Sequence, residues 1–296
     1  GVKYHCWKKH GHGYMRLRNA IKQSCDIYFY EMARLLGVDK LSIIAKRYGL
    51  GSNILKDIYF DEKKGVVPNT LWKKNALGKA WYLGETVING IGQGYIQTTP
   101  LQLCLMTAQI ANGGYKIKPH ILYDENINFE KVKLKIEKQF MNDSLLNDQI
   151  AKDNHLEERD YQLYEKFHKN SKNINFVKDA MFGSTNEKYG TSYKSRYENP
   201  KYQFAGKTGT SQVRRITEAE RELDLKQSQI EYIKRDHALY IAFAPYKDPR
   251  YSISVLIEHG GSGSKAAAPL ASKLIKKIID RHQLREQIRK GNLTTI

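Results

Sequence analysis

Apolar residues recur at helical spacing through the first fifty residues, with short polar or glycine breaks between them. The pattern predicts helices over 14–23, Ile27–Leu36 and Asp39–Tyr48, and Gly37 is a typical residue to end the second of these. Residues 52–90 lack this periodicity and are expected to be loop-rich. The polar break after the first helix therefore lies at a junction of two helices.

A second helical signal follows a glycine cluster, Gly90-Ile91-Gly92-Gln93-Gly94. Thr99 is a good N-cap and Pro100 suits the first position of a helix. The segment Leu101–Ala111 is almost entirely apolar, which predicts a buried helix.

Charged residues, Asn and Gln dominate 124–175, which we interpret as a surface insertion. Beyond it the pattern becomes strand-like in three places, Tyr202–Val213, Ala238–Ala244 and Tyr251–Glu258. The middle one is apolar on both faces, as expected of a central strand. A closing helix is predicted from Pro269 to about residue 290. Helices, then antiparallel strands, then a helix indicate an α+β fold.

The charge of the chain is strongly positive, with 49 Lys and Arg against 31 Asp and Glu, a net charge of +18. No nucleic-acid-binding signature accompanies these residues, so we expect a solvated basic surface, or one facing anionic lipid or polymer, and no nucleic-acid partner. No apolar run approaches the roughly 18 residues that a membrane span needs, and no signal peptide is visible. Three cysteines exclude a disulfide scaffold.

The short string with the clearest chemistry is Gly206-Lys207-Thr208-Gly209-Thr210, predicted to lie on a strand. An ammonium beside two hydroxyls, with Gly209 allowing a ligand close to the backbone, suits a carboxylate next to a polarised carbonyl. Ser24-Cys25-Asp26, at the helix junction, is a second candidate element.

Together these strings resemble the penicillin-binding, serine-acyl transpeptidases, whose signature set is S-x-x-K, S-D-N and K-T-G. More precisely, the chain resembles the class B, elongation-type penicillin-binding protein 2 subgroup. The resemblance extends to Trp7–Gly13, Ser24–Tyr30, Gly90–Tyr95, Lys207–Val213, Ala242–Tyr246 and Glu258–Gly261. It implies a partial penicillin-binding/β-lactamase-like fold: a helical subdomain, the last three antiparallel strands and the closing helix. We expect one transpeptidase domain in three parts, 1–123, 124–175 and 176–296.

The resemblance also implies roles for matching residues. Ser24 would relay a proton during acyl transfer, and Asp26 would hydrogen-bond the catalytic lysine or the substrate amide. Lys207 would orient this network. Thr208 and Thr210, with Gly209 between them, would bind the carboxylate of the substrate or of a β-lactam. The backbone N–H of Thr210 would supply half of the oxyanion hole.

The nucleophile of the family is not visible where the resemblance places it, upstream of Ser24, because no serine precedes that residue. A literal S-x-x-K string, Ser262-Gly263-Ser264-Lys265, lies downstream, and we interpret it as a loop entering the last helix. The chain is therefore expected to be the C-terminal part of a transpeptidase, with a sheet edge and an apolar face uncovered. An inactive product of a truncated or split gene, with at most a binding role, is the alternative, and a β-lactamase or regulatory relative is a further one.

Cysteines and histidines cluster near the start of the chain, at Cys6, His10, His12 and Cys25. Thiolates and imidazoles suit tetrahedral Zn²⁺. Some elongation-type members carry a structural zinc on a His and a Cys that match His12 and Cys25, and Cys6 is a candidate third ligand, with the fourth expected upstream of Gly1. A buried Cys25, a surface His12 or a Cys6–Cys25 disulfide are the alternatives. Catalysis itself is expected to need no cofactor.

The resemblance implies a peptidoglycan D,D-transpeptidase that acts by serine acyl transfer on D-Ala-D-Ala stem peptides during cell elongation. The implied partners are nascent or lipid-linked peptidoglycan, β-lactams and membrane proteins of the elongation machinery. The implied location is the periplasmic face of the inner membrane, with the anchor outside these residues.

Overall fold

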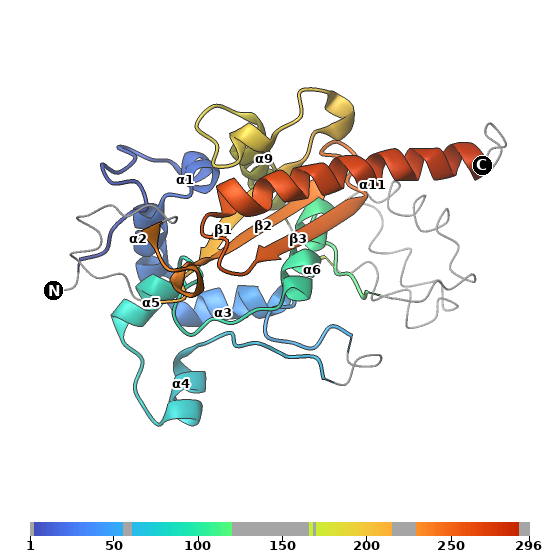
Figure 1. Cartoon of the computed structure of the whole chain (residues 1–296). Helices are drawn as coiled ribbons and strands as arrows, with labels where there is room; N and C mark the ends of the chain where they lie inside the picture. Colours follow the sequence, from blue (N-terminus) through green and yellow to red (C-terminus); the bar gives the residue numbers. More distant parts are fainter. Residues whose placement is uncertain (1–2, 56–60, 120–165, 168–169, 215–228, 290–296) are drawn as a thin grey trace, which may run out of the picture.

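The computed structural model describes residues 3–55, 61–119, 166–167, 170–214 and 229–289. They form a three-stranded antiparallel sheet with helices on both faces and a group of helices beside it (Figure 1). The predicted α+β class is therefore confirmed. We call the strands with α1, α6, α9 and α11 the sheet lobe, and α2 to α5 the helical lobe; most of the predicted insertion lies outside the described residues.

The strands are β1 (Ala205–Ser211), β2 (His237–Ala244) and β3 (Tyr251–Ile257), in the order β1-β2-β3. In the register, Thr210 lies opposite Ala238, and Ala238 lies opposite Ile257. Because β2 is central, its side chains are buried on one face and buried or partly buried on the other, as its unbroken apolar run predicts.

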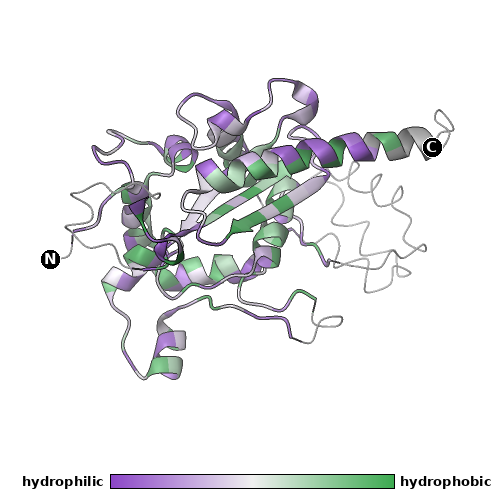
Figure 2. Cartoon of the chain, in the orientation of Figure 1, coloured by the Kyte–Doolittle hydropathy of each residue, from purple (hydrophilic) through white to green (hydrophobic). Residues whose placement is uncertain are grey.

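The two faces of β2 contact different helices, because side chains alternate along a strand. Tyr240 and Ala242 face α11 (Ala268–Arg289) and pack against its Ile275. Phe243 faces the other way and joins a cluster with Ala111 of α6 (Pro100–Ala111) and Met181 of α9 (Ser171–Asn186). Figure 2 shows hydrophobic residues concentrated in the strands and in the parts of α11 that cross them.

The helices of the first ninety residues are α1 (Leu17–Gln23), α2 (Asp26–Leu36), α3 (Val38–Arg47), α4 (Thr70–Leu77) and α5 (Leu83–Asn89). The first three confirm the predicted helices within a few residues. The predicted cap of α6 is also present: Thr99 Oγ1 accepts from the backbone N–H of Gln102 at 3.2 Å. The described residues also contain short helical turns at Tyr193–Ser195, Pro200–Tyr202, Tyr232–Lys234 and Gly263–Ala267.

Residues 52–90 are loop-rich, as predicted, but they also contain two short helices, α4 and α5, that the pattern did not predict. Both are short, and α5 contains Gly84 and a β-branched run, all poor helix formers. They are stabilised by tertiary contacts instead: Lys73 of α4, 2% exposed, forms an ion pair with Glu85 of α5. The Lys73 ammonium also lies 4.7 Å from the ring centroid of Tyr82.

Helix α9 is likewise not predicted by the apolar pattern. It begins at Ser171, after Asn170 whose side chain accepts from the N–H of Lys172 at 2.9 Å. The expected end of the insertion, residue 175, therefore falls inside this helix. Its last turns contain Gly183, Ser184 and Thr185, which are not apolar and so give no hydrophobic pattern. All three are nonetheless buried within the sheet lobe.

Candidate active site

The Ser24-Cys25-Asp26 string forms the predicted junction between α1 and α2. Ser24 ends α1 in a left-handed conformation, with φ 54° and ψ 52°, a region that non-glycine residues visit seldom and at some cost. The N–H of Cys25 donates to the carbonyl of Ala20 at 3.0 Å, and Asp26 is the first residue of α2. The tight turn therefore places three consecutive side chains at one corner.

Lys207 of β1 reaches this corner from the sheet. Its Nζ lies 2.5 Å from Ser24 Oγ and also donates to the carbonyl of Thr208 at 3.0 Å. The two motifs, 183 residues apart in sequence, thus meet side chain to side chain. An ammonium at this distance stabilises negative charge on the hydroxyl oxygen and can exchange a proton with it.

Burial changes the pKa values of both charged groups at the corner. Desolvation lowers the pKa of Lys207 to about 8, an effect that the nearby Asp26 carboxylate partly opposes. Desolvation raises the pKa of Asp26, against the opposing effects of a hydrogen bond from Trp7 and the charge of Lys207. The pKa of Lys207 is therefore close to the pH at which it would work, as acid–base catalysis near neutral pH requires.

Trp7 fastens the N-terminal segment to this corner. Its backbone N–H donates to Asp26 Oδ2 at 2.8 Å, and its indole N–H donates to the carbonyl of Ser24 at 2.8 Å. One Asp26 oxygen is therefore occupied by the protein backbone. Sequence reasoning missed this role, although Trp7 lies in one of the strings that carry the resemblance.

The hydroxyl of Thr208 points into a chain of hydroxyl groups. Thr208 Oγ1 donates to Thr191 Oγ1 at 2.9 Å, and Thr191 Oγ1 lies 3.0 Å from Ser184 Oγ of α9. The N–H of Thr191 donates to the carbonyl of Lys22 at 3.3 Å. Thr191 thus links β1, α1 and α9, and it holds Thr208 in one orientation.

An ion-pair cluster fixes α1 against α9 just beneath the corner. Arg18 bonds Asp179 at 2.5 Å and Glu187 at 2.6 Å, and Lys22 bonds Glu187 at 2.7 Å. The hydrogen bond from Arg18 is the main reason why the pKa of Glu187 falls to about 2. Ion pairs from Arg18 and Lys22 thereby hold α1, the helix that Ser24 ends, against α9.

Gly209 and Thr210 complete the expected substrate edge of β1. A Cβ on Gly209 would lie 3.3 Å from the side chain of Leu239, so this face has little room for one. Thr210 is exposed, and its carbonyl accepts a hydrogen bond from Gln93 at 2.7 Å. The structure thus brings together Ser24 and Lys207, and it places Thr208, Gly209 and Thr210 along one strand.

The ligand atoms of Cys6, His12 and Cys25 all lie within 4.8 Å of one another. Cys6 Sγ is 3.3 Å from His12 Nδ1, and both cysteines are free thiols, so the disulfide alternative is not what the structure contains. Ligand atoms around one tetrahedral Zn²⁺ are about 3.5 Å apart, so the donor set fits that ion. Desolvation lowers the pKa of His12 and keeps the ring neutral, as a ligand must be.

The downstream S-x-x-K string does not form a serine–lysine pair. Ser262 Oγ contacts Ser264 Oγ at 2.9 Å, while Lys265 is exposed. The backbone there packs so closely on the sheet that residue 263 must be glycine, because a Cβ at that position would lie 2.4 Å from the carbonyl oxygens of Gly209 and Leu239. This agrees with a loop that packs on β1 and leads into α11.

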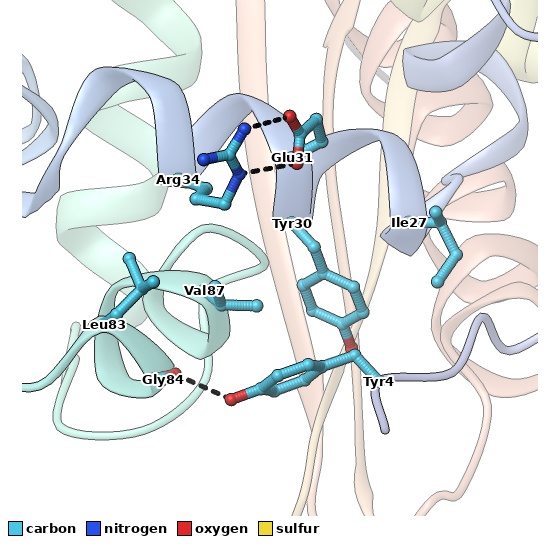
Figure 3. A pocket seen from close by; sticks show the side chains of 8 residues that line it. All are labelled: Tyr4, Ile27, Tyr30, Glu31, Arg34, Leu83, Gly84 and Val87. Carbon is cyan, nitrogen blue, oxygen red and sulfur yellow. Dashed lines mark hydrogen bonds and ion pairs between the residues drawn. The ribbon is translucent and has the colours of Figure 1, made fainter. Parts of the chain in front are cut away.

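A separate apolar pocket lies between the N-terminal segment, α2 and α5 (Figure 3). Tyr4 crosses it: its hydroxyl donates to the carbonyl of Gly84 at 3.4 Å, and its ring centroid is 5.3 Å from that of Tyr30. A Glu31–Arg34 ion pair lies at its rim. None of the expected catalytic residues lines it, and its contacts attach the N-terminal segment to the helical lobe.

Comparison with known proteins decides the family. The penicillin binding protein transpeptidase domain matches residues 1–276. The chain belongs to this transpeptidase family. A transpeptidase relative, peptidoglycan D,D-transpeptidase MrdA of Salmonella typhimurium strain LT2, is 34% identical over 94% of the chain. The corresponding MrdA of Escherichia coli K12 is 30% identical, also over 94%.

Solved transpeptidase structures show the same fold. The Pseudomonas aeruginosa PBP2 complex with WCK 5153 matches with a TM-score of 0.68 and 31% identity, over 93% of this chain and 49% of that one. A complex between PBP2 and MreC from Helicobacter pylori matches with a TM-score of 0.68 and 29% identity, over 95% of this chain and 43% of that one. The chain spans 40% of the length of the Salmonella relative and 38% of the Escherichia coli one. Among the described residues, no helix combines the length and apolarity that crossing a membrane requires.

Proposed function

We propose that this chain is part of a peptidoglycan D,D-transpeptidase of the elongation type, with the nucleophilic serine supplied by a segment outside these residues. The observation that carries the proposal is the 2.5 Å contact between Ser24 Oγ and Lys207 Nζ. The names of the MrdA relatives support the reaction class.

The proposed reaction is acyl transfer through a covalent intermediate. The serine oxygen attacks the carbonyl of the penultimate D-Ala, a C–O bond forms, and the C–N bond breaks. The leaving D-Ala amine takes up the proton that the serine lost, with Ser24 and Lys207 as the relay. The amine of a neighbouring stem peptide then attacks the ester carbonyl, a C–N bond forms and the C–O bond to the serine breaks. The proton that the amine loses returns to the serine oxygen through the same relay.

The other residues of the site hold the substrate. Thr208 and Thr210, beside Gly209, bind the terminal carboxylate, and the N–H of Thr210 donates to the developing oxyanion. Asp26 holds the N-terminal segment through Trp7 and adds negative charge beside Lys207. The protein would act at the periplasmic face of the inner membrane, and the PBP2–MreC complex of Helicobacter pylori supports elongation-machinery partners.

Labelling of the complete gene product with a fluorescent β-lactam tests this proposal. We expect a labelled polypeptide that is larger than 34.2 kDa and contains Lys207. Lys207→Ala is expected to slow labelling by about 10²–10³, and Lys194→Ala, an exposed lysine, serves as the control. An unlabelled complete product would overturn the proposal. Labelling of the 34.2 kDa chain alone would place the nucleophile within these residues instead.

A structural Zn²⁺ on Cys6, His12 and Cys25 is part of the proposal. Desolvation raises the pKa of Cys25, so its thiol is protonated without a metal, and zinc binding would release protons. The ion would hold the segment that carries Trp7 against the Ser24 corner. Elemental analysis of purified protein should give one zinc per chain, lost in Cys25→Ser and kept in Cys104→Ser. Metal-free protein that folds normally would contradict this site.

A further inference from the structure

The edge of β1 that faces away from β2 carries a contact with the helical lobe beside the Ser24–Lys207 pair. Gln93 Nε2 donates to the carbonyl of Thr210 at 2.7 Å, and Gln93 Oε1 accepts from the N–H of Gln212 at 3.4 Å. One carboxamide thus supplies both a donor and an acceptor to the end of the strand that carries the Lys-Thr-Gly motif.

The geometry of a strand fixes what this contact controls. The N–H and the C=O of one residue leave a β-strand on the same side. Since the carbonyl of Thr210 points to Gln93, the N–H of Thr210 also points to the free edge of β1. The carbonyl of Thr208, two residues earlier, points the same way, because it accepts from Lys207 Nζ.

Gln93 is itself held in one place. Its N–H donates to the carbonyl of Ile88 at 3.2 Å, at the end of α5. The glycines on either side, Gly92 and Gly94, have φ values of 77° and 84°, which other residues seldom adopt. The glycine cluster of the sequence is therefore a turn that presents a single side chain to β1.

The turn is also tied to the helix that begins at Asp26. A Cβ on Gly90 would lie 2.3 Å from the Cβ of Ala33 and 3.0 Å from the carbonyl oxygen of Phe29, both in α2. The end of α5 thus rests directly on α2. A short, packed path runs from the Ser24 corner through α2 and Gly90 to Gln93, and from there to Thr210.

We propose that Gln93 is a positioning residue whose carboxamide holds the Thr210–Gln212 edge of β1, so that the N–H of Thr210 faces the reacting carbonyl. The inference rests on the proposed function. It assigns to the helical lobe a part in setting the oxyanion geometry.

Hydrogen exchange of the 296-residue chain tests the contact without any need for activity. Gln93→Ala removes both bonds, so the amide of Gln212 should exchange faster than in the wild type. Gln93→Glu keeps an acceptor, so protection of that amide should be retained. The amide of Gln97, which donates to the carbonyl of Val66 at 2.9 Å, is the internal reference and should not change. Equal exchange of Gln212 in the wild type and Gln93→Ala would overturn the contact.

Acylation kinetics of the complete gene product test the role. Both variants should lower the β-lactam acylation rate at saturation by about 10- to 100-fold, and leave the half-saturating concentration within about 2-fold, because geometry rather than ligand capture is lost. Gln93→Glu should be at least as slow as Gln93→Ala, because its carboxylate faces the carbonyl of Thr210. Gln97→Ala, an exposed glutamine of the same lobe, should match the wild type.

The outcomes separate the two proposals. A wild type that takes no β-lactam refutes the transpeptidase assignment, while the exchange experiment still decides the contact. A wild type that is acylated, with Gln93→Ala and Gln93→Glu acylated at the same saturating rate, refutes the positioning role alone. A rise in the half-saturating concentration with an unchanged rate would also refute it, since that pattern reports ligand capture.

Discussion

The two lobes of the molecule bury their apolar residues to very different extents. In the sheet lobe, Phe204 and Tyr240 are 0% exposed and sit between the strands and α11. In the helical lobe, Leu35 of α2 is 59% exposed and Leu83 of α5 is 61% exposed. The sheet lobe thus has the more completely buried core, whereas the helical lobe leaves more of its large apolar side chains in contact with solvent. The active-site corner lies where the two meet.

The largest effect should come from the packed lobe. Phe204→Ala is expected to lower the free energy of unfolding by about 3–5 kcal/mol, because it removes a fully buried ring next to Tyr197 and Tyr240. Urea denaturation measures this loss. Phe176→Ala, at a position 38% exposed, is the matched control and should cost much less. Similar losses in both would mean that burial of the ring does not set the cost of its removal.

The ion-pair cluster that joins α1 to α9 should contribute less. Glu187→Gln is expected to lower the free energy of unfolding by about 1 kcal/mol near neutral pH, after allowance for partial solvent screening. Because the pKa of Glu187 is lowered to about 2, this contribution is complete above the ordinary value of 4.5 and is lost as pH falls from there through about 2. Denaturation at several pH values measures it, and a difference that grew on acidification would contradict it.

Lys207 should titrate near neutrality, because burial lowers its pKa to about 8. Above that pH its ammonium is lost, so acylation of the complete protein should fall as pH rises. Since the unfolded chain keeps this proton to about 10.5, the same group makes folding more favourable as pH rises between those values. NMR titration of the lysine side chain measures the pKa.

Asp26→Asn removes the charge that partly opposes this shift, so the Lys207 titration should move to lower pH. Asp39→Asn is the control outside the corner and should leave the midpoint where it is. An upward movement in Asp26→Asn would mean that the carboxylate does not act on Lys207.

The smallest effect is expected on the exposed face of the helical lobe. Leu35→Ser should change the free energy of unfolding of this chain by no more than about 0.5 kcal/mol, and should lower its binding of an apolar dye, since less hydrophobic surface is left in water. Urea denaturation and dye fluorescence measure the two effects. A loss above 1 kcal/mol would show that this side chain is covered, in conflict with its exposure.

Local patterns predicted what depends on local chemistry. Three such signals specify their elements directly, and each element is found: the apolar run of β2, the strand-like pattern of β3 and the Thr99 cap of α6. The junction at Ser24 was placed correctly for the same reason. Helices α4 and α5 were not predicted, because they are stabilised by the Lys73–Glu85 ion pair, a tertiary contact that the local sequence pattern does not reveal.

The sequence predicted which residues the motifs contribute to the candidate site, but not the hydrogen bonds that join them to the rest of the molecule. Ser24 and Lys207 were found through motif resemblance, and the structure brings them together. The hydrogen bonds of Trp7, Thr191 and Gln93 were not found, because none of them follows a helical or strand spacing. Trp7 and Gln93 donate to backbone carbonyls, which carry no sequence signature, and Thr191 accepts from the hydroxyl of Thr208. The glycines around Gln93 were the available signal.

The left-handed backbone of Ser24 sets the stability of the fold against the presence of a hydroxyl group at that position. Its φ of 54° is a conformation that glycine adopts freely and serine only at an energetic cost. Glycine at residue 24 would relax the turn and remove the hydroxyl that meets Lys207. Selection for thermal stability alone would therefore favour glycine here and lose the proposed proton relay, whereas selection for the proposed reaction would retain serine in its strained conformation.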